Sequence, residues 1–336
     1  RVRDPRILKV NQELIEAGAP EEIATLAHPH IGTDQLRSIV RRLREKIIAL
    51  GGEVHFHTRM DHLLLDQGRI CGVSTSRGEW TGKAVVLALG HSARDTFEAL
   101  LQQNVFLEAK DFAIGVRVEH LQQHIDQAQY GSFAGDPRLK PAEYRLTFQS
   151  ANGRGVYTFC MCPGGQVVAS ASDRESIVTN GMSVYARDGL NANSAVLVQV
   201  RRSDFGNGPL DGIRYQKNLE HQAWILGGRK GFAPCQRVDD YLRGMPSTSW
   251  GEVVPSYRPG VTMTDLNPLF EAAINDSLKQ ALQDFDRRIP GFASSQALMT
   301  AVETRSSCPL RIARDPQTLQ SLSTAGLYPA GEGAGY

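Results

Sequence analysis

The sequence predicts a mixed fold, α/β in one portion and α+β in another, divided into two domains. A helical stripe over residues 33–50 is followed by a hairpin pattern and an apolar strand pattern, an order typical of α/β units. Residues 111–323 carry short β-like segments and polar turns instead, and helical stripes return at residues 215–226 and 268–285. A length of 336 residues is also that of two domains of ordinary size.

Charge and composition restrict the class of function. The chain has 37 Lys and Arg against 36 Asp and Glu, a formal net charge of +1, and so lacks the positive excess with which proteins bind nucleic-acid backbones. Its apolar runs are far shorter than the roughly 20 residues of a membrane span, and no signal-peptide pattern opens the chain. We therefore expect a cytoplasmic protein that acts on a small molecule, without a nucleic-acid or membrane partner.

The cysteines and histidines do not predict a metal site. None of the five cysteines forms a Cys-x-x-Cys pair, and the histidine pairs have no third ligand nearby in sequence. Cys160 and Cys162 allow two interpretations, a redox or metal-binding pair and two small side chains of a core strand. The second is the more common use of such residues.

The N-terminal third predicts helices first and strands after them. Residues 1–32 form a helical appendage of two short helices. Thr33 is a candidate N-cap for a long helix that ends at the Gly51-Gly52 pair, and its apolar residues share one buried stripe over more than four turns. Strands are expected at residues 53–58 and in a hairpin over residues 62–75.

The next strand pattern covers residues 80–89 and leads into a candidate ligand-binding turn. Its continuous apolar run, residues 84–89, is typical of a parallel strand that is covered on both faces. A glycine turn at residues 89–93 and a helix at residues 94–103 follow. Ligands of open α/β sheets bind at the carboxyl ends of the strands, so this turn is expected to contact one.

A second strand-to-turn pattern lies near the end of the sequence. Residues 326–331 read as a buried strand entering a glycine turn, in which Glu332 could accept hydrogen bonds from hydroxyl groups. Because this returns to the α/β pattern, residues 111–324 are read as an inserted β-rich domain between residues 33–110 and 325–336. A Gly-x-Gly-x-x-Gly fingerprint occurs nowhere in the chain.

Residues 302–311 are the best candidate for contact with an anion or substrate. They include Arg305 and Cys308, and a guanidinium group offers forked hydrogen-bond donors to anions. The alternative is a structural ion pair between Glu303 and Arg305. The glycines of residues 152–165 either permit close backbone approach to a ligand or form two hairpin turns.

Five segments in order resemble the bacterial FAD-dependent dehydrogenase-like flavoproteins, distant relatives of the BaiN-type NAD(P)/FAD oxidoreductases. The segments are residues 28–34, 87–97, 152–165, 303–311 and 328–336. The resemblance covers nearly the whole chain and is specific to the family, though not to a reaction.

The resemblance implies a flavoprotein with two dinucleotide-binding folds. It identifies residues 33–110 and 325–336 as the remnant of a Rossmann-like FAD-binding domain, and residues 111–324 as an inserted substrate or cap domain. The N-terminal strand, glycine loop and helix that would hold the FAD pyrophosphate are absent, and the last family motif continues beyond Tyr336. The resemblance therefore marks the chain as a fragment that would hold FAD poorly by itself.

The same resemblance implies site residues and a reaction. Hydride would pass to or from flavin N5, with NAD(P)H as a possible reductant and an unknown small molecule as substrate. Arg305 is expected to provide electrostatic stabilisation, and Cys308 to lie near the flavin ring. The implied FAD-binding residues are Val54, Leu89, Gly90, His91, Gly331, Glu332, Gly333 and Ala334.

Two alternatives stay open. Without a pyrophosphate loop, the chain could be a non-catalytic binding or scaffold module on a flavoprotein fold. It could also belong to an RNA-modifying flavoprotein, because four arginines gather on one predicted helix. They are Arg37, Arg41, Arg42 and Arg44. The near-zero net charge favours a solvated helix face for them instead.

Overall fold

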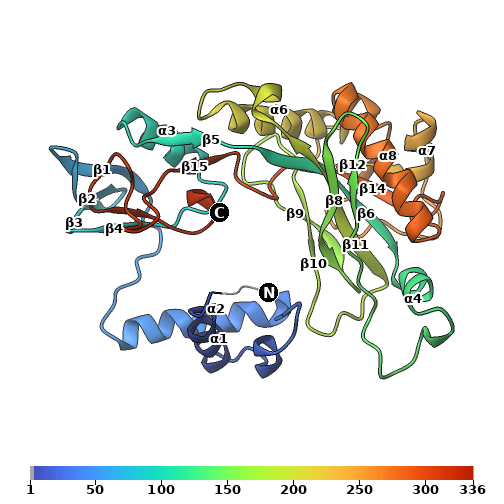
Figure 1. Ribbon diagram of the computed structural model, residues 1–336, viewed down its shortest axis with the longest axis horizontal. Helices are drawn as coiled ribbons and strands as arrows, with labels where there is room; N and C mark the ends of the chain where they lie inside the picture. Colours follow the sequence, from blue (N-terminus) through green and yellow to red (C-terminus); the bar gives the residue numbers. More distant parts are fainter. Residues whose placement is uncertain (1–3, 336) are drawn as a thin grey trace.

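The computed structural model describes residues 4–335. The first three residues of the predicted appendage and Tyr336, at the end of the predicted cofactor segment, lie outside them. The described chain has a larger part built on a wide sheet, a smaller part with short strands, and a layer formed by α1 (Ile7–Glu16) and α2 (Thr33–Ala49) (Figure 1).

The larger part contains a seven-stranded mixed sheet with the order β13-β12-β14-β6-β11-β8-β7. Its central strands β6 (Phe112–Leu121) and β11 (Asn191–Val200) pair antiparallel in continuous register. β12 and β13 pair in parallel, and the other neighbours pair antiparallel. The remaining strands are β7 (Thr147–Gln149), β8 (Gly155–Cys162), β12 (Ala233–Arg237), β13 (Val261–Met263) and β14 (Leu298–Glu303).

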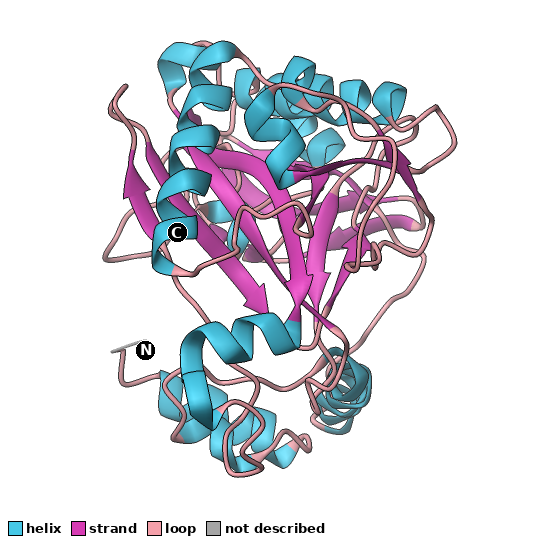
Figure 2. Cartoon of the chain, turned by 90° about the vertical axis from the view of Figure 1, so that its right-hand side faces the viewer, coloured by secondary structure: helices cyan, strands magenta, loops and turns pink. Residues whose placement is uncertain are grey.

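Side-chain alternation gives this sheet one apolar and one more polar face. Even-numbered residues such as Val116 and Val196 join the main apolar cluster, which α6 (Asp211–Leu226) and α8 (Ala272–Arg288) complete. Figure 2 shows helices gathered along one face of the sheet. Odd-numbered positions include Arg117, which contacts Asn180 of the small β9–β10 hairpin. The strands of that hairpin are β9 (Gln166–Ala169) and β10 (Thr179–Met182).

The smaller part joins segments from both ends of the sequence. β4 (Val85–Leu87) pairs in parallel with β16 (Leu327–Pro329), and β5 (Leu107–Ala109) pairs antiparallel with β15 (Leu310–Ile312). A separate apolar cluster holds these pairs against α3 (Arg94–Gln102). The adjoining three-stranded sheet consists of β1 (Met60–Asp66), β2 (Arg69–Thr75) and β3 (Gly78–Thr81), which includes the predicted hairpin.

Shorter elements complete the described chain. They are η1 (Glu21–Ala24), α4 (Gln122–Tyr130), η2 (Gly131–Phe133), α5 (Arg202–Phe205), α7 (Val238–Arg243), η3 (Asn267–Leu269) and η4 (Glu332–Ala334). No helix within residues 4–335 is both long enough and apolar enough to cross a membrane.

Two strand predictions are wrong. Residues 53–58 form an unpaired connection between α2 and β1, because no described strand offers hydrogen-bond partners to their backbone. Residues 80–89 are not one strand covered on both faces: β3 and β4 are separate, and the Val86 side chain is 68% exposed. The parallel pairing predicted from this run is nevertheless confirmed by β4 and β16.

The long helix is confirmed, but its predicted buried stripe is not. Ile39 of α2 is buried against Ile23 and against residues 14–19, at the end of α1. Leu36, Val40 and Ile47 are exposed. The apolar spacing identified the helix correctly because spacing follows the helix period. Whether such a stripe is covered depends on other elements, which the spacing does not contain.

Candidate functional site

Two predicted cofactor segments meet where β4 and β16 end. The strands run in parallel, so the turn after Leu87 and the turn after Pro329 emerge at the same edge. The backbone N–H of Ala330 donates to the carbonyl oxygen of Leu87 at 2.9 Å. A methyl group added at Gly333 would lie 2.7 Å from the carbonyl oxygen of Gly90. The structure thus brings Leu89, Gly90 and His91 next to residues 331–334.

Both turns contain a glycine in a left-handed conformation. Gly90 has φ 68° and Gly331 has φ 66°, values at which a side chain causes strain. No described heavy atom outside each glycine and its chain neighbours lies within 4 Å of where its Cβ would be. The backbone at these two positions is therefore open to close approach by a ligand.

His91 presents an unpaired acceptor beside these turns. The Nε2 of His91 lies 3.3 Å from Gln216 Oε1, and Gln216 donates its own Nε2–H to the carbonyl oxygen of Thr304 at 2.7 Å. The amide orientation makes Gln216 Oε1 the acceptor, so His91 carries its proton on Nε2. The buried Nδ1 then has a free lone pair and no hydrogen-bond partner among the described residues.

Electrostatics keep this histidine neutral. Burial lowers the pKa of His91 to about 4, and the positive charges of Arg305 and Arg94 also lower it, although the Gln216 hydrogen bond acts in the opposite direction. Partial burial raises the pKa of Glu332, against the attraction of Lys110. Near neutral pH the imidazole is therefore uncharged.

The pair formed by His91 and Glu332 fits a ligand that carries hydroxyl groups. His91 Nδ1 lies 3.6 Å from Glu332 Oε1, and these two atoms are both acceptors when the carboxyl is ionised. A hydroxyl donor placed beside them would satisfy a buried atom that is otherwise unpaired. The residues present thus fit the polyhydroxyl portion of FAD.

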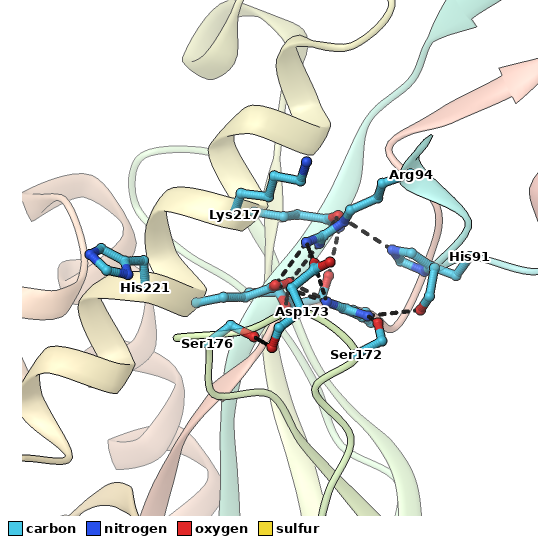
Figure 3. Close-up of polar contacts among 12 residues, drawn as sticks. His91, Arg94, Ser172, Asp173, Ser176, Lys217 and His221 are labelled. Carbon is cyan, nitrogen blue, oxygen red and sulfur yellow. Dashed lines mark hydrogen bonds and ion pairs between the residues drawn. The ribbon is translucent and has the colours of Figure 1, made fainter. Parts of the chain in front are cut away.

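Arg305 belongs to a buried ion-pair cluster next to the same turns. Figure 3 labels Arg94 and Asp173 of this cluster. Its guanidinium donates to Glu220 at 2.9 and 3.2 Å, to Asp173 at 3.2 Å and to Ser92 at 2.8 Å. The alternative of a structural ion pair between Glu303 and Arg305 is wrong. Glu303, the last residue of β14, instead accepts from the fully buried Arg117 on the neighbouring strand β6, whereas Arg305 lies beyond the end of β14 and pairs with Glu220.

Two other predicted site residues are Cys308, whose thiol is unreactive, and Val54, which is not part of either turn. Cys308 is buried in the apolar cluster of the smaller part, where burial raises its thiol pKa to about 11. A neutral thiol at that position is a poor nucleophile. Val54 lies in the unpaired connection that follows α2. The catalytic role of Cys308 and the cofactor contact of Val54 stay predictions.

The two cysteines of β8 do not lie in a core. Cys160 is exposed, with φ 42°, and it sits where the β8–β11 register is interrupted by a bulge. Cys162 is half-buried, and burial raises the pKa of its thiol. The interpretation as two core side chains is wrong, because the bulge changes the alternation on which it depends.

Sequence reasoning missed the partners of Arg305 and His91. They are Asp173, Gln216 and Glu220, to which Arg94 also donates. Gln216 and Glu220 could have been recognised from the sequence, because they are polar residues four positions apart on the helix stripe that otherwise carries apolar residues. Asp173 gave none, because it lies on an irregular loop between β9 and β10.

Comparison with known proteins gives one curated relative and two solved structures of interest. A protein of Clostridium beijerinckii (strain ATCC 51743 / NCIMB 8052), described as uncharacterized, is 45% identical over 338 residues. The match covers 100% of this chain and 63% of the relative, so the chain spans less than two thirds of the relative's length.

The structural similarities are weak. An oxidoreductase from Methanosarcina mazei has a TM-score of 0.32 and 11% identity, over 90% of this chain and 50% of that one. CtdE in complex with FAD has a TM-score of 0.27 and 8% identity, over 88% of this chain and 53% of that one. Scores this low do not establish a shared fold.

A family match is more informative. Residues 111–306 match the family described as FAD-dependent protein, C-terminal domain-like. This segment is more than half of the chain and contains the seven-stranded sheet together with Gln216, Glu220 and Arg305. The chain therefore belongs to the FAD-dependent protein, C-terminal domain-like family.

Proposed function

We propose that this chain forms part of an FAD-dependent oxidoreductase that transfers hydride to or from a small substrate. Family membership supports the cofactor. The observation that carries the proposal is the meeting of two open glycine turns with an unpaired buried acceptor, His91 Nδ1, at the ends of β4 and β16.

In this proposal the chain's own residues bind and orient the cofactor. The backbone at Gly90 and Gly331 allows close approach, while His91 Nδ1 and Glu332 accept hydrogen bonds from ligand hydroxyls. Bound FAD supplies hydride chemistry at N5. Arg305 contributes a fixed positive charge, held in place by Glu220.

We propose a division into domains that is based on which segments bind the cofactor. Residues 33–110 and 325–336 form the cofactor-binding portion, a Rossmann-like remnant, and residues 111–324 form the inserted substrate domain. Support comes from the pair β4–β16, which joins the two proposed cofactor-binding segments within one apolar cluster. β15 lies within residues 111–324 but pairs with β5 in the same cluster, and α2 packs against α1, so neither element follows this division. NADH or NADPH as the reductant stays a prediction.

No structural observation favours the RNA-modifying alternative. Three of the four clustered arginines are engaged within the protein: Arg41 pairs with Glu45, Arg42 donates to the carbonyl oxygen of Ala17, and Arg44 stacks over Phe56. Guanidinium groups held in this way have fewer donors left for phosphates.

Absorption spectra of this chain and of the longer C. beijerinckii relative test the proposal. We expect the relative to purify with flavin absorbance that bleaches anaerobically on addition of NADH or NADPH. The chain should bind added FAD more weakly than the relative. Two colourless proteins that do not bind added FAD would contradict the proposal and favour the scaffold alternative.

A further inference from the structure

Two arginines from different parts of the molecule pair with one carboxylate beside the proposed cofactor turns, and one of them, Arg94, is labelled in Figure 3. Arg94 begins α3 in the smaller part, and Arg305 follows β14 in the larger part. Both pair with Glu220 of α6. We call these three residues the arginine clamp.

Glu220 is the permanent anion of the clamp. Its side chain is fully buried, and it accepts two hydrogen bonds from Arg94, at 2.7 and 2.8 Å, and two from Arg305. These bonds lower the pKa of Glu220 despite its burial. Two guanidinium charges and one carboxylate leave the clamp with one uncompensated positive charge. The clamp by itself is therefore complementary to a single negative charge.

Asp173 supplies that charge in the structure. One oxygen, Oδ2, accepts from Arg94 Nη1 at 2.6 Å and from Arg305 Nη2 at 3.2 Å. Two N–H groups thus point at one oxygen position. Arg94 Nε is buried and has no partner among residues 4–335, so the clamp also has an unused donor.

Asp173 differs from Glu220 in how firmly it is held. It lies on the loop between β9 and β10, in a run of five exposed residues, 171–175, and its side chain is 39% exposed. The loop is anchored beyond this run, where the N–H of Ile177 donates to the backbone carbonyl oxygen of Glu220. An exposed carboxylate on an irregular loop can leave two buried guanidiniums at a lower cost than Glu220 can.

We propose that the arginine clamp binds the carboxylate group of a small monocarboxylate substrate, and that the Asp173 carboxylate occupies this position when no substrate is bound. The inference rests on the proposed function for the reaction, but the binding site itself needs no flavin. Arg305 also donates to Ser92, next to His91, so a carboxylate in the clamp would be held beside the β4 turn.

A purely structural role for the cluster predicts a different behaviour. If Asp173 only ties α3 to the larger part, its removal lowers stability and creates no binding site. If Asp173 occupies a carboxylate site, its removal lowers stability and also raises affinity for carboxylates, because the competing group has gone. Affinity for a small carboxylate therefore separates the two roles.

The test is calorimetric titration of acetate into this chain and into Asp173→Ala, with Asp188→Ala as the matched control. Asp188 is exposed and its replacement changes the net charge equally. We expect Asp173→Ala to bind acetate at least about tenfold more tightly than the wild-type chain and the control, since binding no longer competes with Asp173. Adding Arg305→Met to Asp173→Ala should abolish the gain.

Titrations of acetamide and inorganic phosphate test whether the site is specific for a carboxylate. Acetamide, which is neutral and similar in shape to acetate, should not gain affinity, and inorganic phosphate should gain less than acetate. If Asp173→Ala does not fold, Asp173→Asn is tested in its place. We expect a smaller gain in acetate affinity for Asp173→Asn. An acetate affinity of Asp173→Ala no higher than that of Asp188→Ala, or an equal gain for phosphate, would overturn the proposal. Neither result depends on flavin absorbance, so the proposed function can fail or succeed separately.

Discussion

Two buried histidines, His91 and His120, are held neutral by their surroundings. His120 donates from Nε2 to the carbonyl oxygen of Phe292 at 2.8 Å, and its Nδ1 has no partner among the described residues. Burial lowers the pKa of each ring to about 4, far below the ordinary value of 6.5. Each histidine therefore resists protonation in the folded chain at pH values where the unfolded chain accepts a proton.

This difference predicts a loss of stability in acid. Between pH 6.5 and 4 the unfolded state binds more protons at these rings, so the free energy of unfolding falls as pH falls. From pH 7 to pH 5 the loss for His120 is about 2 kcal/mol. His120→Gln should remove that part of the dependence in urea titrations at the two pH values. The control is His62→Gln, at an exposed ring. The same pH dependence in His120→Gln and wild type would refute the explanation.

The buried pair of Arg117 and Glu303 gives a second prediction for single residues. Arg117 also donates to Asn180 and Asn193, but Glu303 is the one anion hydrogen-bonded to it among the described residues. Glu303→Gln leaves a buried guanidinium without a compensating charge and should lower the free energy of unfolding by about 3–5 kcal/mol. Glu45→Gln, in an exposed pair with Arg41, should change it little. Equal effects in urea denaturation would show that the Arg117 charge is compensated elsewhere.

Among the elements, α2 shows most clearly that an apolar stripe does not by itself produce burial. Neighbouring residues of the helix differ sharply: the Ile39 side chain is 1% exposed and that of Val40 is 56% exposed. Ile39→Ala should therefore cost about 2–5 kcal/mol of stability in urea denaturation. Val40→Ala should cost far less, since alanine also favours the helix. A comparable loss at Val40 would mean that this face of α2 is covered in solution.

For the molecule as a whole, sequence reasoning predicted the ends of two strands better than the contacts between distant residues. Parallel pairing of β4 with β16, and the juxtaposition of Gly90 with residues 331–334, follow from local apolar runs that end in glycine. The clamp could not be predicted, because Arg94, Glu220 and Arg305 come from three elements that only tertiary packing brings together. The strand predicted at residues 53–58 is absent for a related reason. A strand requires a neighbouring strand, and its own sequence does not specify that neighbour.

We infer that the turns after β4 and β16 contact FAD, and the FAD affinities of two glycine variants test this contact. A methyl group at Gly333 would press on the Gly90 carbonyl oxygen and separate the turns, whereas one at Gly155, on β8, meets no described atom within 4 Å. Titration followed by flavin fluorescence should show Gly333→Ala binding FAD at least about tenfold more weakly than wild type, and Gly155→Ala unchanged. Equal affinities of the wild-type chain and both variants would contradict this inference.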